Sequence, residues 1–157
     1  FDTTLEGGRP IGKLFLASIN KFYGFTSMGS SNGVGGIFQF DPATNIFSFM
    51  AALDSTNTGA NAHGGFTELN NKLYATIING GGVAGEGVFL EFDFLANSIT
   101  QNTSTSGHPK GTPLKASDNK LYWLTSNGGT NGKGSIVSYN VAEIFSKLRL
   151  QHMESHH

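Results

Sequence analysis

Short hydrophobic stretches alternate with stretches rich in glycine and asparagine along the chain, and the alternation repeats. The repeated segment reads NKFYGFTSMGSSNGVGGIFQFD at 20–41, NKLYATIINGGGVAGEGVFLEFD at 71–93 and NKLYWLTSNGGTNGKGSIVSYN at 119–140. Its Lys-x-Tyr landmark recurs about every 50 residues, and repeats of that length are typical of propellers, solenoids and related arrays. The periodicity therefore predicts architecture more strongly than any single residue predicts chemistry.

Each unit is expected to hold four short strands, because its hydrophobic stretches are rich in the β-branched and aromatic residues that strands favour. In the first unit these stretches are 14–17, 21–26, 36–41 and 46–52. In the second they are a stretch around Phe66 and then 72–77, 87–93 and 98–103, and in the third a stretch around Leu114 and then 120–125, 135–140 and, more weakly, 144–150. Short connections join only antiparallel neighbours, so each unit is predicted to be a four-stranded antiparallel meander.

Two local details of the units follow from the same comparison. Asp41, Asp93 and Asn140 share the position where the third strand ends. An Asp that alternates with Asn at a turn is most simply an Asx-turn former that bonds nearby backbone. The second unit also has one extra residue between Val88 and Asp93 when it is set against the first. A β-bulge in that strand is expected to absorb it.

A small sheet with apolar residues on both faces has to stack on a neighbour, and four-stranded blades arranged radially are the commonest solution. The fold class predicted is therefore all-β, with tandem propeller-like blades. The units are repeat 1 at 1–52, repeat 2 at 53–101, repeat 3 at 102–150 and a tail at 151–157. Propellers close with four to eight blades, so three units indicate part of a larger array or a ring completed by oligomerisation. A compact three-unit arrangement with pseudo-threefold symmetry is the alternative.

The consensus of the units resembles the GloVer tandem repeats of secreted and cell-surface bacterial proteins, chiefly of Bacteroidetes. In the first unit the matching residues are Pro10, Gly12, Leu14, Ala17, Lys21, Tyr23, Gly24, Thr26 and the run 37–42. The second unit departs most, because His63 replaces the glycine of Gly12 and Phe94 replaces Pro42. The resemblance implies an extracellular or cell-surface location and no defined enzymatic activity. The paired glycines and aromatics also resemble, more loosely, Kelch-type propeller blades.

Composition and charge narrow the function classes. Charged residues make up 13 % of the chain, about half the usual share, and the formal net charge is −1. Nucleic acid is not an expected partner, since its binders normally carry a basic stripe. No apolar run approaches the ~20 residues that a membrane span requires. The chain has no cysteine, which excludes disulfides, thiolate metal sites and cysteine nucleophiles.

Signals for catalysis are weak, so no catalytic residue, metal or cofactor is predicted. The sequence has no H-E-x-x-H spacing, and its two histidines within the repeats, His63 and His108, occupy different columns. The glycine-rich loops lack the register of a phosphate loop and the helix that gives such a loop its affinity for anions. Because the glycines recur in every unit, a repeated turn geometry explains them better.

One end of the meanders is the expected binding face. The connection between the second and third strands and the connection between units should emerge at the same end, and loops on a rigid scaffold usually carry recognition. The candidate binding residues are Arg9, Asn32, His63, His108, Trp123, Asn127 and Asn131. Trp123 stands where the other units have Gly24 and Ala75. It is either a local packing residue or a stacking platform for a sugar or a partner aromatic.

The sequence thus favours a non-enzymatic extracellular repeat module that acts as a scaffold, an adhesive segment or a binding platform for a protein or a glycan. Two alternatives stay open. One is a carbohydrate-binding or carbohydrate-active propeller with its ligand at the glycine-rich loops. The other is a structural subunit of a filament or surface assembly that self-associates through its open repeat ends.

Overall fold

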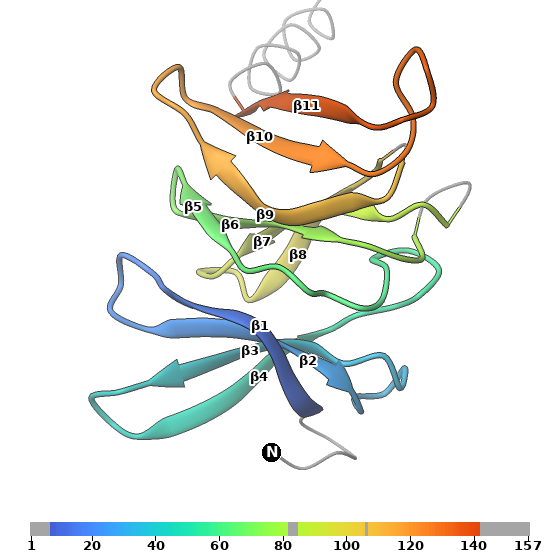
Figure 1. The fold of residues 1–157 in the computed structure, drawn as a ribbon. Coiled ribbons are helices and arrows are strands. Elements are labelled where there is room, and N and C mark those ends of the chain that lie inside the picture. The colour runs from blue at the N-terminus through green and yellow to red at the C-terminus, as the bar shows by residue number, and fades with distance from the viewer. Residues whose placement is uncertain (1–6, 82–84, 106, 142–157) are drawn as a thin grey trace, which may run out of the picture.

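The strands of the computed structural model form three antiparallel sheets, stacked one on the next (Figure 1). The structure describes residues 7–81, 85–105 and 107–141. Sheet 1 contains β1 (Gly8–Leu16), β2 (Phe22–Met28), β3 (Gly36–Asp41) and β4 (Ile46–Ala52). Sheet 2 contains β5 (Thr67–Leu69), β6 (Lys72–Ile77), β7 (Val88–Asp93) and β8 (Ser98–Ser104). Sheet 3 contains β9 (Pro109–Lys115), β10 (Lys120–Thr125) and β11 (Ser135–Asn140).

The predicted all-β class and the antiparallel meanders are confirmed, since neighbouring strands in each sheet are consecutive in the chain. Strand β8 runs to Ser104, past the boundary predicted at 101. The fourth strand predicted for the third unit, 144–150, and the tail at 151–157 lie outside the described residues, as does the start of the first unit at 1–6.

The tight turns have the predicted chemistry. The side-chain oxygen Oδ1 of Asp41 accepts a hydrogen bond from the backbone N–H of Ala43 at 2.9 Å, and Oδ1 of Asp93 accepts one from Leu95 at 2.9 Å. Both are Asx turns, which bridge a carboxylate to backbone two residues on. Phe94, which replaces the proline of the first unit, therefore leaves the turn after the third strand unchanged.

The bulge predicted within β7 is wrong. The β6–β7 ladder runs without interruption from Leu73 opposite Phe92 to Ile77 opposite Val88. Register shifts occur instead where the fourth strands pair with the third, in both four-stranded sheets. The second unit must therefore place its extra residue elsewhere.

That residue lies in the glycine-rich loop before β7. The structure aligns Gly87 with Gly35 and Gly134, each of which directly precedes its third strand. The N–H of Gly35 bonds to the C=O of Gly29, and that of Gly134 to Gly128, whereas that of Gly87 bonds to Gly80, which is one residue further back. A loop absorbs an added residue at little cost, whereas a strand loses ladder hydrogen bonds.

Each sheet has two faces, which alternate along its strands. The tyrosine face carries Tyr23, Tyr74 or Tyr122 on the second strand of sheets 1, 2 and 3 respectively. The reverse face carries the residue before each tyrosine, paired across the ladder with Phe40, Phe92 or Tyr139 on the third strand. These names are used below.

The tyrosine face of sheet 1 packs on the reverse face of sheet 2. Phe25 and Ile37 of sheet 1 share one buried cluster with Leu73 and Leu90 of sheet 2. The ring of Tyr23 lies 6.2 Å from the ring of Phe92, measured between centroids. Apolar side chains from both sheets thus form a single core layer.

The tyrosine face of sheet 2 packs on the reverse face of sheet 3 in the same way. Tyr74 and Phe89 share a second buried cluster with Leu121 and Trp123. The ring of Tyr74 lies 6.5 Å from the ring of Tyr139, which stands at the position of Phe92. The same pair of faces therefore meets twice, in the same order along the chain.

The sheets come into backbone contact along their first strands. The N–H of Lys13 in β1 points to the C=O of Gly64 at 3.4 Å, just before β5, and the N–H of Gly65 donates to Thr112 Oγ1 of β9 at 2.7 Å. A Cβ atom on Gly12 would lie only 2.1 Å from the C=O of Gly64, so a side chain does not fit there. Glycine lets the first strands approach this closely.

The glycine before each third strand offers a test of this geometry. Gly87 has a φ of +100°, and a Cβ there would lie 2.4 Å from the C=O of Ile77, whereas Gly85 in the same loop has a φ of +67° and open space around it. We expect Gly85→Ala to cost about 1 kcal/mol for left-handed backbone. Gly87→Ala should cost at least about 2 kcal/mol, since strain and a backbone clash add together. Urea unfolding checks both, and equal losses would contradict the geometry.

Candidate functional site

The glycine-rich loops gather with the linkers between units at one end of the sheets, here called the loop end. The N–H of Gly81 donates to the C=O of Ser55 at 2.7 Å, which ties the second loop to the first linker. The N–H of His108 donates to the C=O of Glu86 at 3.1 Å, and the N–H of Asn127 to that of Gly107 at 3.1 Å. The predicted gathering of loops and linkers is confirmed by these contacts.

Five of the seven candidate binding residues lie at this end: Arg9, Asn32, His108, Asn127 and Asn131. Three of them hold the loops together through hydrogen bonds. Asn32 Nδ2 donates to the C=O of Leu53 at 3.0 Å, His108 Nδ1 lies 3.2 Å from the C=O of Ile78, and Asn127 Oδ1 accepts from Ser126 Oγ at 2.9 Å. Arg9 and Asn131 are exposed.

His63 does not lie with the loops. Its exposed side chain precedes the segment where Gly64 touches Gly12, at the middle of β1 rather than at its loop end. The first strand of the second unit is also short: β5 has three residues, whereas β1 has nine. The departure from the repeat pattern at His63 thus coincides with a shortened strand.

Trp123 is a packing residue between sheets 2 and 3. Its indole lies parallel to the ring of Phe89, with centroids 4.5 Å apart and an angle of 8°, and it is only 6 % exposed. One ring face is therefore occupied by Phe89, so Trp123 does not offer the open stacking platform that the sequence left as one option. Its N–H edge is buried as well.

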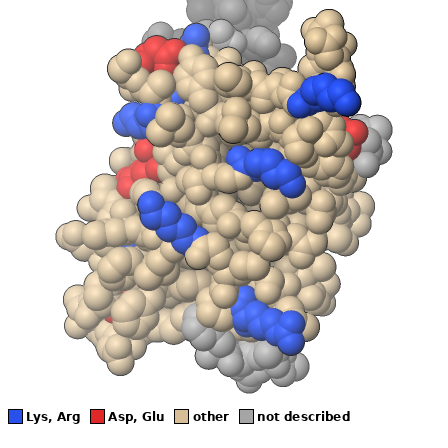
Figure 2. Space-filling view, in the orientation of Figure 1, with Lys and Arg blue, Asp and Glu red and all other residues tan. Residues whose placement is uncertain are grey.

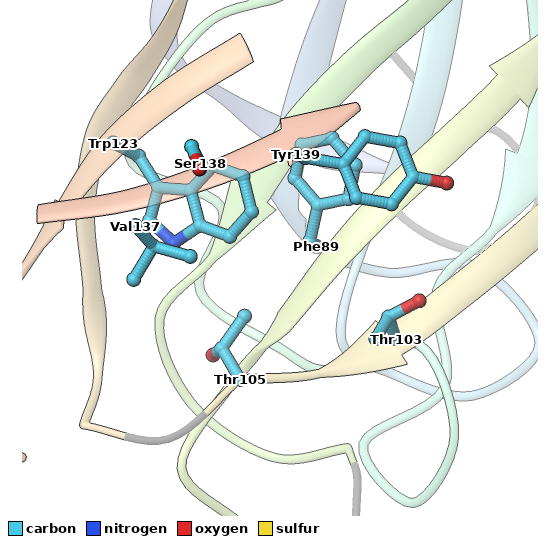
Figure 3. Close-up of a pocket in the computed structure, with 7 residues that line it drawn as sticks. All are labelled: Phe89, Thr103, Thr105, Trp123, Val137, Ser138 and Tyr139. Carbon is cyan, nitrogen blue, oxygen red and sulfur yellow. The ribbon is translucent and has the colours of Figure 1, made fainter. Parts of the chain in front are cut away.

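That edge borders a pocket of about 270 Å³ between the tyrosine face of sheet 2 and the reverse face of sheet 3 (Figure 3). The lining residues are Phe89, Thr103, Thr105, Trp123, Val137, Ser138 and Tyr139. The pocket lies beside β11, which is the last described strand of sheet 3. It is also close to the loop end, because the N–H of Thr105 donates to the C=O of Gly87 at 3.0 Å.

Two polar atoms of this pocket have no hydrogen-bond partner among the described residues: Trp123 Nε1 and Thr105 Oγ1. Both side chains are more than nine-tenths buried. In Figure 3 the indole nitrogen points into the space between Trp123 and Thr105. A buried polar atom without a partner costs about 1–3 kcal/mol, and such atoms in a cavity mark a place for a water or a ligand. Sequence reasoning found Trp123 but missed Thr105, because the second unit contributes it and nothing local signals it.

The Lys-x-Tyr landmark forms a polar cluster in every unit. In sheet 2, the hydroxyl of Tyr74 donates to Glu91 Oε2 at 2.9 Å, and Lys72 forms an ion pair with the same carboxylate. In sheet 1, Gln39 takes the place of Glu91: its Nε2 donates to the hydroxyl of Tyr23 at 2.6 Å. In both sheets the partner of the tyrosine hydroxyl stands opposite that tyrosine on the third strand.

The third cluster draws its acid from a turn. Tyr122 donates to Asp118 Oδ2 at 2.8 Å, and Lys120 Nζ lies 3.7 Å from the same oxygen. The residue opposite Tyr122 in the ladder is Ser138, which is too short to take the place of Glu91. The Lys-x-Tyr landmark thus has a structural role, in which the partner of the tyrosine hydroxyl differs from unit to unit. It does not indicate catalysis.

Burial and hydrogen bonds shift the pKa values in the central cluster. Burial, helped by the neighbouring carboxylate, raises the pKa of Tyr74 far above its ordinary value. Burial also acts to raise the pKa of Glu91, but hydrogen bonds from Lys72, Thr100 and Tyr74 outweigh it and hold that pKa below the ordinary value. Glu91 is therefore a buried carboxylate that stays ionised, as its partners require.

Lys and Arg side chains on the side seen in Figure 2 are separated by uncharged surface. In residues 7–81, 85–105 and 107–141, no three His, Asp or Glu side chains gather where they could hold a metal ion. No helix in the described part of the chain is long and apolar enough to span a membrane.

No protein-family model matches the chain, and no curated protein matches it. A function therefore has to be argued from the stacked faces, the loop end and the pocket.

Replacing Glu91 by Gln tests the electrostatics, with Gln39 of sheet 1 as the natural precedent. At pH 7 we expect Glu91→Gln to lower the free energy of unfolding by about 1–2 kcal/mol, because charge-assisted bonds from Lys72 and Tyr74 become neutral ones. The folded pKa of Glu91 is depressed, so its contribution is present above the ordinary Glu pKa of about 4.3 and is lost as pH falls. The difference between the two proteins should therefore shrink as the pH falls below that value and through the depressed folded pKa. A difference that is the same at pH 7 and pH 3 would contradict this assignment.

Proposed function

We propose that the chain is a non-enzymatic repeat module of the extracellular space, in which propeller-like blades form a rigid scaffold that presents one end for binding. The observation that carries the proposal is the repeated packing of a tyrosine face on a reverse face, from sheet 1 to sheet 2 and again from sheet 2 to sheet 3. A unit that packs on one neighbour with its tyrosine face and on the other with its reverse face is suited to building a stack of repeats, so we assign it a structural role.

Two features support the propeller-like arrangement. Each sheet adds its strands in chain order from the first strand outward. The first strands meet through hydrogen bonds of the segment just before β5: the N–H of Lys13 points to the C=O of Gly64, and the N–H of Gly65 donates to the side chain of Thr112, as expected of inner strands around a common axis. Meanders stacked face to face, with their first strands together, have the organisation of propeller blades.

The loop end supports a binding role. The described parts of its three glycine-rich loops are tied to the linkers by backbone hydrogen bonds, whereas the strand connections described at the opposite end are tight turns. The extracellular location rests on the resemblance to GloVer repeats.

A rigid scaffold should unfold as one unit, because each sheet depends on its neighbour for a core. We expect a single calorimetric transition whose measured enthalpy equals the van't Hoff enthalpy. Trp123→Ala removes the largest side chain between sheets 2 and 3 and should lower the midpoint of the whole transition. Two separate transitions in the unaltered protein would contradict a rigid scaffold. Turnover of p-nitrophenyl esters or glycosides that is lost in Thr105→Val would overturn the non-enzymatic assignment.

Carbohydrate binding in the pocket is the second candidate, and the two partnerless polar atoms favour it. Sugars offer hydroxyl groups that both accept and donate, so one could satisfy Trp123 Nε1 and Thr105 Oγ1 together. Phe89, Trp123 and Tyr139 contribute apolar side chains to the lining of the same pocket, and apolar linings with a few polar groups are typical of ligand sites.

Conservative variants separate this candidate from simple packing. Trp123→Phe removes the N–H and keeps an aromatic ring, and Thr105→Val removes the hydroxyl and keeps the shape. On a glycan array we expect saturable binding that weakens about tenfold in each variant, the equivalent of one hydrogen bond. Leu95→Ala, in the exposed turn between β7 and β8, serves as the matched control and should bind normally. If the unaltered protein binds no glycan, the candidate fails; Thr105→Val should then leave stability unchanged or raise it.

A further inference from the structure

Each internal interface joins a tyrosine face to a reverse face, and the two ends of the stack leave one face of each kind without a neighbouring sheet. Sheet 1 presents a reverse face at one end, and sheet 3 presents a tyrosine face at the other. We propose that the chain associates head to tail with a second copy of itself, with the tyrosine face of sheet 3 packed on the reverse face of sheet 1 of the second copy. This inference rests on the proposed stacking function and names its partner.

The tyrosine face of sheet 3 is apolar and exposed. Ile136 is 74 % exposed, although the equivalent residues Ile37 in sheet 1 and Phe89 in sheet 2 are 0 % and 1 % exposed. Leu124, which pairs with Ile136, is 57 % exposed, and Phe25 at its position in sheet 1 is 0 % exposed. Positions that form the core of two sheets therefore face solvent in the third.

Leu114 of β9 extends this surface. It pairs with Tyr122, so it lies on the same face, and it is 68 % exposed. Large aliphatic side chains from three neighbouring strands thus lie exposed on one face, which also carries Lys110 opposite Leu124. Patches of this kind on soluble proteins mark interaction surfaces.

The reverse face of sheet 1 is aromatic and only partly covered. Phe22 and Phe40 form a ladder pair on it and are half-buried, whereas the equivalent pair in sheet 2, Leu73 and Phe92, is 0 % exposed. Leu16 of β1, opposite Phe22, is 52 % exposed. Phe47 and Phe49 of β4 lie on the same face, opposite Phe40 and Phe38.

A second copy is the partner that these faces fit. Within the chain, Tyr23 meets Phe92 at 6.2 Å and Tyr74 meets Tyr139 at 6.5 Å. Tyr122 is the next tyrosine in this series, and Phe40 is the remaining member of the opposing series. The new interface would therefore continue an established one, with Tyr122 of one copy against Phe40 of the other.

The contact is heterologous, because each copy contributes a different face. Such contacts make rings when the rotation closes and open filaments when it does not. Two copies provide six sheets, which lies within the four to eight blades of natural propellers. The expected assembly is therefore a closed dimer that contains both copies of the interface.

Charge placed on either face should prevent association of the full chain. Ile136→Lys alters only the tyrosine face of sheet 3, and Leu16→Lys only the reverse face of sheet 1. In analytical ultracentrifugation at about 100 μM we expect the unaltered protein to sediment as a dimer, and each variant to sediment as a monomer. The loss should be at least about a hundredfold in affinity, since an unpaired charge is buried in the interface. Leu95→Lys, in an exposed turn away from both faces, is the matched control and should stay dimeric.

A mixture of the two variants decides the geometry. Each variant keeps the face that the other has lost, so an equimolar mixture of Ile136→Lys and Leu16→Lys should form a dimer through one intact interface. A symmetric contact between identical faces would not recover in this way. A monomeric unaltered protein, or a dimer that survives both substitutions, overturns the proposal. The scaffold function is tested separately by calorimetry. A monomer that unfolds in one cooperative transition would contradict the dimer but would agree with the scaffold function.

Discussion

Burial of both faces of sheet 2 is the constraint on which the structure depends. A single small antiparallel sheet is marginally stable in water, because one layer of side chains leaves too much apolar surface exposed. Phe92 on one face and Tyr74 and Phe89 on the other are all at most 1 % exposed. Each buried aromatic or aliphatic side chain contributes about 1.5–3 kcal/mol, so neither neighbouring sheet can be lost without a large cost. The sheets therefore fold as a stack and not as separate units.

The tyrosine hydroxyls that are buried between the sheets have hydrogen-bond partners there. Tyr74 lies within the stack, and its hydroxyl needs a partner there; Glu91 supplies it and is itself paired with Lys72. A buried carboxylate is tolerated only when its hydrogen bonds are complete. Gln39 solves the same problem in sheet 1, whereas Tyr122, on the outer face of sheet 3, is only partly buried and donates to Asp118. The lysine and tyrosine of the repeated landmark persist for this reason, although the acceptor changes.

The sequence predicted the features that arise within a single unit. The second and third strands, the Asx turns at Asp41 and Asp93 and the gathering of loops at one end follow from local pattern and short connections. The predicted bulge in β7 depends on matching Gly87 with Gly36 of the first unit. In the structure Gly87 is instead equivalent to Gly35, because both have a positive φ and directly precede the third strand. The packing of Trp123 on Phe89 and the pocket beside it depend on which face of one unit meets the next. Which face of one unit packs on which face of the next cannot be predicted from the sequence of either unit alone.

The central claim is that the same two faces meet at both internal interfaces, and proton–proton Overhauser contacts between aromatic rings test it most directly. The account predicts cross-peaks between Tyr23 and Phe92 and between Tyr74 and Tyr139, whose ring centroids are 6.2 and 6.5 Å apart. Phe38 and Phe47, which stack within sheet 1 at 5.4 Å, provide the internal control. A spectrum with the Phe38–Phe47 cross-peak but without either of the other two would contradict the stacked arrangement.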